Sequence, residues 1–134
     1  MTILLPPGWP RPRGYSCGVV AEGATVYVSG QVGWDEQGRF VSDDFVPQVR
    51  RALENVVAVL AAGGAGPEHI VRLTWYVTDK AAYLANLPEI GLAYRATIGR
   101  HYPAMSVGAV SALVEDRARV EIEATAVIPR EEGR

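Results

Sequence analysis

The sequence predicts a single α+β domain, with two amphipathic helices on one face of a five- or six-stranded mixed sheet. Strand-like and helical segments follow one another in the order β-β-α-β-α-β-β, and both helical segments carry an apolar stripe. The chain has 134 residues, close to the usual size of one domain, and holds no internal repeat or linker. We therefore expect one domain over residues 1–134. Its first 14 residues hold four prolines, which favours an extended N-terminal arm.

The first two strands are expected at residues 15–20 and 25–31, joined as a hairpin through residues 22–23. In the second segment Val26 and Val28 alternate with more polar side chains. Such alternation is typical of a strand with one apolar face.

The first helix is expected at residues 43–62. Residues 42–44 offer side chains that suit a helix N-terminus, and residues 63–64 are glycines that favour its end. Pro47 falls in the first turn, where proline is tolerated. The apolar stripe consists of Phe45, Val49, Leu53, Val56, Val57 and Leu60.

The second half of the chain contains three further strands and a second helix. Residues 70–78 alternate between two faces, as a strand does. Residues 81–98 are helical in pattern, and Pro88 should kink or restart that helix. The last two strands are expected at residues 105–110 and 119–128, and we expect them to pair with each other.

The closing strand separates its side chains by face. Val120, Ile122, Ala124 and Ala126 point one way, and Glu121, Glu123 and Thr125 point the other. The helices would cover the apolar face, so the open face would carry Thr74, Tyr76, Met105 and the carboxylates. A mixed face of this kind is more often covered by another subunit than left in water, and we therefore expect an oligomer with clefts between subunits.

Composition argues against several classes of protein. The net charge is −2 and the basic residues are scattered, which gives no reason to expect nucleic acid. The single cysteine, Cys17, fits a reducing compartment, and no apolar run approaches the ~20 residues of a membrane span. No signal peptide is recognisable, so we expect a cytoplasmic protein. No residue spacing resembles a metal site or a phosphate-binding loop, and we expect neither metal nor cofactor.

Several short motifs stand in a characteristic order along the chain. They are Gly14-Tyr15-Ser16, Val28-Ser29-Gly30-Gln31, the helix at 48–62, Trp75-Tyr76-Val77-Thr78-Asp79, Tyr102-Pro103-Ala104 and Val120-Glu121-Ile122-Glu123-Ala124. Over about residues 14–128 they resemble the RidA/YjgF family of enamine/imine deaminases. The resemblance implies a chorismate-mutase-like subunit and a homotrimer with three small-molecule sites in the clefts between subunits.

The resemblance also implies site residues. The family's site tyrosine falls on Tyr15, its pocket-lining Ser-Gly on Ser29 and Gly30, and its water-positioning glutamate on Glu121. The arginine that grips the substrate carboxylate would follow Pro103-Ala104, where this chain has Met105. The chain therefore resembles a divergent member that lacks the usual substrate anchor.

Hydrolysis of a C=N bond needs a water held against the carbon, and a carboxylate can orient and partly deprotonate that water. Glu121 is the best candidate for this catalytic role, although a solvated or ion-paired strand carboxylate is the alternative. Glu123 is more simply read as one half of a structural ion pair, with Arg72 or Arg119.

Met105 offers a soft apolar surface where an arginine would offer two parallel donors. The absence of that arginine would cost several kcal/mol of binding to an imino acid, since charged hydrogen bonds contribute roughly 1.5–3 kcal/mol each. We expect weak or no activity on 2-iminopropanoate-type substrates, unless Arg100 or His101 compensates. Simple packing of Met105 is the alternative.

Other candidates carry two interpretations each. Tyr15 would bind substrate or cap the hairpin, and Gly30 would expose its N–H or mark a bulge. Tyr102 would line the pocket with Trp34 and Trp75, as a wall for a conjugated substrate, or all three would only pack. His101 is more simply structural than catalytic, and a catalytic role for Cys17 is not expected.

The sequence thus favours a RidA-like hydrolase that deaminates an enamine or imine other than a simple 2-imino acid. The alternative is a trimer that binds a small molecule without catalysis. Ribonuclease activity, a label that some family members carry, fits poorly with the acidic balance of the chain.

Overall fold

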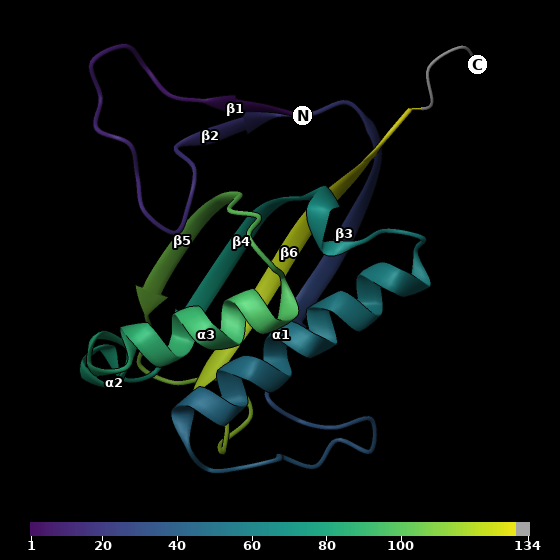
Figure 1. The fold of residues 1–134 in the computed structure, drawn as a ribbon. Helices are drawn as coiled ribbons and strands as arrows, with labels where there is room; N and C mark the ends of the chain where they lie inside the picture. The colour runs from purple at the N-terminus through teal and green to yellow at the C-terminus, as the bar shows by residue number, and fades with distance from the viewer. Residues whose placement is uncertain (131–134) are drawn as a thin grey trace.

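The computed structural model describes residues 1–130 and has the predicted α+β class (Figure 1). Residues 131–134 of the predicted domain lie outside the described residues. The strands are Thr2–Leu4 (β1), Gly18–Val20 (β2), Gly23–Gln31 (β3), Ile70–Val77 (β4), Ala104–Ala109 (β5) and Val120–Pro129 (β6), and the α-helices are Phe45–Ala62 (α1), Lys80–Ala85 (α2) and Leu87–Thr97 (α3).

The six strands are divided between two sheets. The main sheet has four strands in the order β3-β6-β4-β5, in which β4 and β5 run parallel and the other pairs are antiparallel. The strands β1 and β2 form a separate antiparallel pair (Figure 1). The predicted hairpin between residues 15–20 and 25–31 is therefore wrong. β3 pairs with β6 along most of its length, so the short β2 pairs instead with the first strand of the supposed arm.

The predicted pairing of the last two strands is also wrong, because β4 lies between β5 and β6. The cause is the connection from β4 to β5, which runs through α2 and α3. A helical crossover returns the chain parallel to the strand it left, and so places β5 beside β4. The register then sets Met105 opposite Leu73 and Ser106 opposite Thr74.

The helices α1 and α3 lie on one face of the main sheet (Figure 1). The predicted stripe of α1 packs there, with Val49, Leu53, Val56 and Leu60 fully buried. On β6, alternate residues from Val120 to Ala126 are buried against the helices, as predicted.

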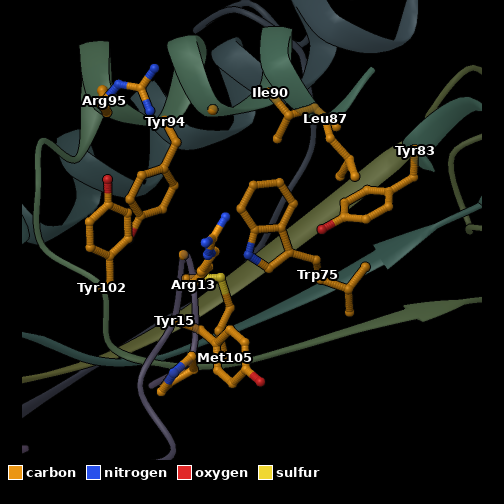
Figure 2. Close-up of a pocket in the computed structure, with 14 residues that line it drawn as sticks. Arg13, Tyr15, Trp75, Tyr83, Leu87, Ile90, Tyr94, Arg95, Tyr102 and Met105 are labelled. Carbon is orange, nitrogen blue, oxygen red and sulfur yellow. The ribbon is translucent and has the colours of Figure 1, made fainter. Parts of the chain in front are cut away.

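The predicted break in the second helix is confirmed. Asn86 separates α2 from α3, and Pro88 occupies the first turn of α3, where it needs no hydrogen-bond donor. The two pieces together bring Tyr83, Ile90 and Tyr94 over the outer part of the sheet (Figure 2). Within residues 1–130, no helix is both long and apolar enough to cross a membrane.

Candidate active site

A pocket of about 790 Å³ lies between the N-terminal segment at residues 12–15, the strands β4 and β5, and the helices α2 and α3 (Figure 2). Three of the residues predicted for the site line it: Tyr15, Tyr102 and Met105. The pocket wall also includes Trp75. The structure therefore brings together the part of the predicted set that surrounds Met105.

Tyr15 reaches this pocket because its neighbour Ser16 is fixed to the start of β5. The Ser16 backbone N–H donates to the Pro103 carbonyl at 2.9 Å, and the Ser16 hydroxyl donates to the carbonyl of Tyr102. Ser16 and Ala104 form a short parallel bridge. This link between Ser16 and the start of β5 sets the position of Tyr15 relative to Tyr102, in place of the predicted hairpin.

Tyr102 stacks on Tyr94, with ring centroids 5.5 Å apart and ring planes 12° apart. The Tyr94 hydroxyl donates to the carbonyl of His101. The pKa of Tyr94 is raised mainly because the phenol is buried, and to a smaller extent by the charge interaction with Tyr102. The His101 ring nitrogen Nε2 lies 2.6 Å from the Ile70 carbonyl, which only accepts, so Nε2 carries the hydrogen. His101 thus holds the chain leading into β5, in line with its structural interpretation.

Of the remaining predicted residues, Gly30 and Glu121 meet on the opposite face of the sheet, and Ser29 precedes Gly30 on β3 as an exposed residue. A β-bulge interrupts the pairing of β3 with β6 between Val28 and Gln31, and Gly30 lies in it. A Cβ built on Gly30 would lie 2.7 Å from Oε2 of Glu121, so the carboxylate packs directly over the glycine. The interpretation of Gly30 as the mark of a bulge is therefore confirmed.

Glu123 has a different partner from the one predicted. The Tyr76 hydroxyl donates to Oε1 of Glu123 at 3.1 Å, and none of the ion pairs within residues 1–130 involves Glu123, Arg72 or Arg119. The pairing of β4 with β6 places Tyr76 on the same face as both glutamates. The pKa of Tyr76 is raised, chiefly by the hydrogen bond to Glu123 and by the negative charge of Glu123. Partial burial of the phenol and the negative charge of Glu121 raise it further.

Met105 does not share a face with the carboxylates, contrary to prediction. Side chains alternate across a strand, and Met105 is level with Leu73, which is buried under the helices. Glu121 is level with Tyr76, on the open face. One copy of the chain therefore separates Tyr15, Tyr102 and Met105 from Glu121 by the thickness of the sheet.

The prediction that Trp34 belongs to the aromatic wall of the pocket is wrong. Its ring packs against Phe40, at 5.8 Å between centroids, and its carbonyl accepts from Asn55 on α1. The pocket's actual further aromatic residues are Tyr83 and Tyr94. They come from α2 and α3, on either side of the break at Asn86.

Two further expectations concern metals and thiols. Cys17 is exposed. Over the part of the chain that the structure describes, no three His, Cys, Asp or Glu side chains cluster as metal ligands do.

The family model described as Endoribonuclease L-PSP matches residues 10–128. The chain belongs to the RidA/YjgF family. A 2-iminobutanoate/2-iminopropanoate deaminase of Salmonella typhimurium is 35% identical over 108 residues, covering 78% of this chain and 80% of that protein. A RutC family protein of Pyrococcus abyssi is 31% identical over 118 residues, covering 87% of this chain and 89% of that protein.

Solved structures of RidA/YjgF proteins share the fold. A Rid family protein of unknown function from Yersinia pestis, YyfB, has a TM-score of 0.84 at 33% identity and covers 95% of this chain and 98% of that chain. Escherichia coli TdcF with bound serine has a TM-score of 0.67 at 32% identity and covers 96% of this chain and 99% of that chain. These likenesses confirm the predicted fold class.

Proposed function

We propose that this RidA/YjgF protein is a deaminase that hydrolyses an enamine or imine in a pocket shared by subunits of a homotrimer. The observation that carries the proposal is the division of the site residues between two faces of one sheet. Glu121 and Gly30 lie on the open face, and Tyr15 and Met105 lie in the pocket beneath α3. A neighbouring copy that docks its open face on this pocket would unite them.

The open face suits such a contact. Tyr27 is 79% exposed there, in register with Thr125 of β6. Together with Tyr76 and the two glutamates it makes a mixed aromatic and acidic face of the kind that we expect another subunit to cover. The similar 2-iminobutanoate/2-iminopropanoate deaminase of Salmonella typhimurium and the serine-bound TdcF of Escherichia coli support a small-molecule substrate for this shared site.

In the proposed reaction, the Glu121 carboxylate accepts a hydrogen bond from a water and directs its oxygen at the imine carbon. A C–O bond forms as the C=N π electrons move to nitrogen, which takes up a proton. The resulting carbinolamine loses ammonia and leaves a carbonyl, so the sum is imine plus water to carbonyl plus ammonia. Tyr15 would hold the substrate through its hydroxyl, while Ser29 and the Gly30 N–H would hold it from the other side.

Met105 limits the substrate class. The pocket presents a thioether beside Tyr102 at the position that resembles the family's anchoring arginine. A small 2-imino acid would find no guanidinium at that point, so turnover of 2-iminopropanoate should be weak. We propose a larger enamine or imine with an apolar or conjugated body, handled in the cytoplasm.

The test is ammonia release from freshly generated imines and enamines, with Glu121→Gln as the variant. Loss of a water-positioning carboxylate should lower kcat by roughly 10²–10⁴-fold. Glu123→Gln is the matched control, because Glu123 lies on the same strand and face but contacts Tyr76. An unchanged kcat in Glu121→Gln would refute the catalytic role. Tight binding without turnover of any substrate would favour the alternative, a non-catalytic binding protein.

A further inference from the structure

The indole N–H of Trp75 is a buried donor with nothing to donate to. Trp75 is 2% exposed, and among residues 1–130 its Nε1 is the one fully buried side-chain polar atom without a hydrogen-bond partner. Buried donors are paired in most native structures, because an unpaired one keeps the cost of leaving water. Trp75 lines the pocket, and its nitrogen is directed toward the pocket interior, on the side of Arg13 and Met105 (Figure 2).

The walls around this donor are flat and aromatic. Tyr94 and Tyr102 are stacked on one side, and Tyr83 stands on the other side of the indole (Figure 2). Aromatic faces of this kind favour a planar π system over a saturated group of the same size. The pocket therefore fits a flat ligand body with a hydrogen-bond acceptor.

Two cations border the same pocket. Arg13 comes from the N-terminal segment and Arg95 from α3 (Figure 2). Both are exposed, and neither takes part in the ion pairs found within residues 1–130. A guanidinium is always charged and suits a carboxylate, so these side chains supply a positive charge that Met105 does not.

We propose that the pocket recognises a planar conjugated or aromatic carboxylate, whose oxygen accepts the Trp75 Nε1–H and whose charge faces Arg13. The inference deepens the proposed function and rests on it for the reaction, since it assigns the deaminase an aromatic or conjugated enamine or imino acid as substrate. Trp75 is then a specificity-determining residue, and Arg13 replaces the missing anchor from a different part of the chain.

The experiment uses trans-cinnamate as a planar conjugated carboxylate and 3-cyclohexylpropanoate as its saturated counterpart. Uniformly ¹⁵N-labelled full-length protein gives three indole N–H resonances, from Trp9, Trp34 and Trp75. The resonance missing from Trp75→Phe identifies Trp75. Cinnamate should move that resonance downfield and leave the other two nearly unchanged.

Affinities complete the test. Trp75→Phe keeps an aromatic ring but loses the donor, and should weaken cinnamate binding about tenfold or more, the size expected for one buried hydrogen bond to a charged group. Trp34→Phe, away from the pocket, should change it less than twofold. Arg13→Gln should weaken binding about fivefold and reduce its salt dependence, whereas Arg11→Gln, on the same segment but outside the pocket lining, should not.

Two results would overturn the inference: equal affinity for 3-cyclohexylpropanoate, or cinnamate binding that leaves the Trp75 resonance in place. If Trp75→Phe does not fold, Trp9→Phe and Trp34→Phe identify the Trp75 resonance by elimination, and that resonance in the wild-type protein and the Arg13→Gln variant still decide the matter. The readout is binding, not turnover. A protein with no deaminase activity can still pass this test, and a deaminase of small aliphatic imines would fail it.

Discussion

The carboxylate of Glu121 occupies the space above Gly30 that a side chain at position 30 would need. A Cβ on Gly30 would lie 2.5 Å from Cδ of Glu121, well inside van der Waals contact. Gly30 stands in the bulge of β3, where the strand departs from regular pairing with β6. The glycine therefore sets the orientation of the glutamate that we propose as the catalytic group.

Gly30→Ala should consequently displace Glu121 and impair catalysis. A shift of about 1 Å in a positioned group costs on the order of 10²-fold in rate, so we expect kcat to fall by roughly that factor. Gly108→Ala is the matched control, since Gly108 lies on β5 and a Cβ added there would have no atom within 4 Å. Equal turnover in the two variants would contradict the positioning role of Gly30.

The hydrogen bond between Tyr76 and Glu123 should be visible in a pH titration. It raises the pKa of Tyr76, so the folded chain favours the protonated phenol. The stability that it contributes is complete below about pH 10, the ordinary tyrosine pKa, and is lost as the pH rises through the higher folded-state value. Glu123→Gln removes the charge and should lower the pKa of Tyr76.

Absorbance of tyrosinate near 295 nm measures this shift. The Tyr76 contribution is isolated by subtracting the titration of Tyr76→Phe, made in both the wild-type and the Glu123→Gln background. A Tyr76 transition that stays at the same pH without Glu123 would show that the hydrogen bond does not control it.

Local patterns were sufficient to predict much of this fold. The apolar spacing of α1 and the alternation along β6 are properties of adjacent residues, and both predicted faces are the observed ones. Pro88 restarts the second helix because its ring lacks the N–H that a helix interior needs.

Strand order could not be predicted in the same way, because it depends on pairing between distant segments. Nothing near residues 18–20 shows that Thr2–Leu4 will pair with them, and nothing near Met105 shows that its register is set by β4. The predicted sheet face of Met105 was wrong for this reason. The predicted face of Glu121 was correct, because it followed from the alternation of its own strand. Tyr83 and Arg13 were not predicted as pocket residues, because α2 and the N-terminal segment come together only in the folded chain.

Ser16 should support both stability and ligand binding. It is 9% exposed, and its hydroxyl bonds the Tyr102 carbonyl beside the pocket. Ser16→Ala leaves that carbonyl without its partner, and we expect a loss of about 1 kcal/mol in the free energy of unfolding together with weaker ligand binding. Urea denaturation measures the first effect. Ser106→Ala, an exposed serine on β5, should leave both quantities unchanged.

Gln48 joins the start of α1 to the start of β6. It is fully buried, its Nε2 donates to the carbonyls of Ser42 and Arg117 at 2.9 and 3.0 Å, and its Oε1 accepts from the Arg119 N–H at 2.8 Å. Gln48→Leu keeps the volume but leaves three backbone groups without their side-chain partner, and should lower the free energy of unfolding by roughly 1–3 kcal/mol.

Urea denaturation provides the measurement for Gln48, with Gln37→Leu on the exposed loop as control. A midpoint for Gln48→Leu close to that of the wild type would mean that water replaces the lost hydrogen bonds. The contribution of Gln48 to the fold would then be much smaller than its contacts indicate.

Association through the open face should depend on Tyr27. Tyr27→Arg places a charge on a surface that we propose to be buried between subunits, where an unpaired charge is strongly unfavourable. Light scattering on a sizing column should show a trimer for the wild type and a smaller species for the variant, with deaminase activity lost in parallel. Val114→Arg, at a residue 97% exposed, should remain trimeric and active. A Tyr27→Arg trimer with full activity would place the subunit contact on another face, and Glu121 would then have no pocket to complete.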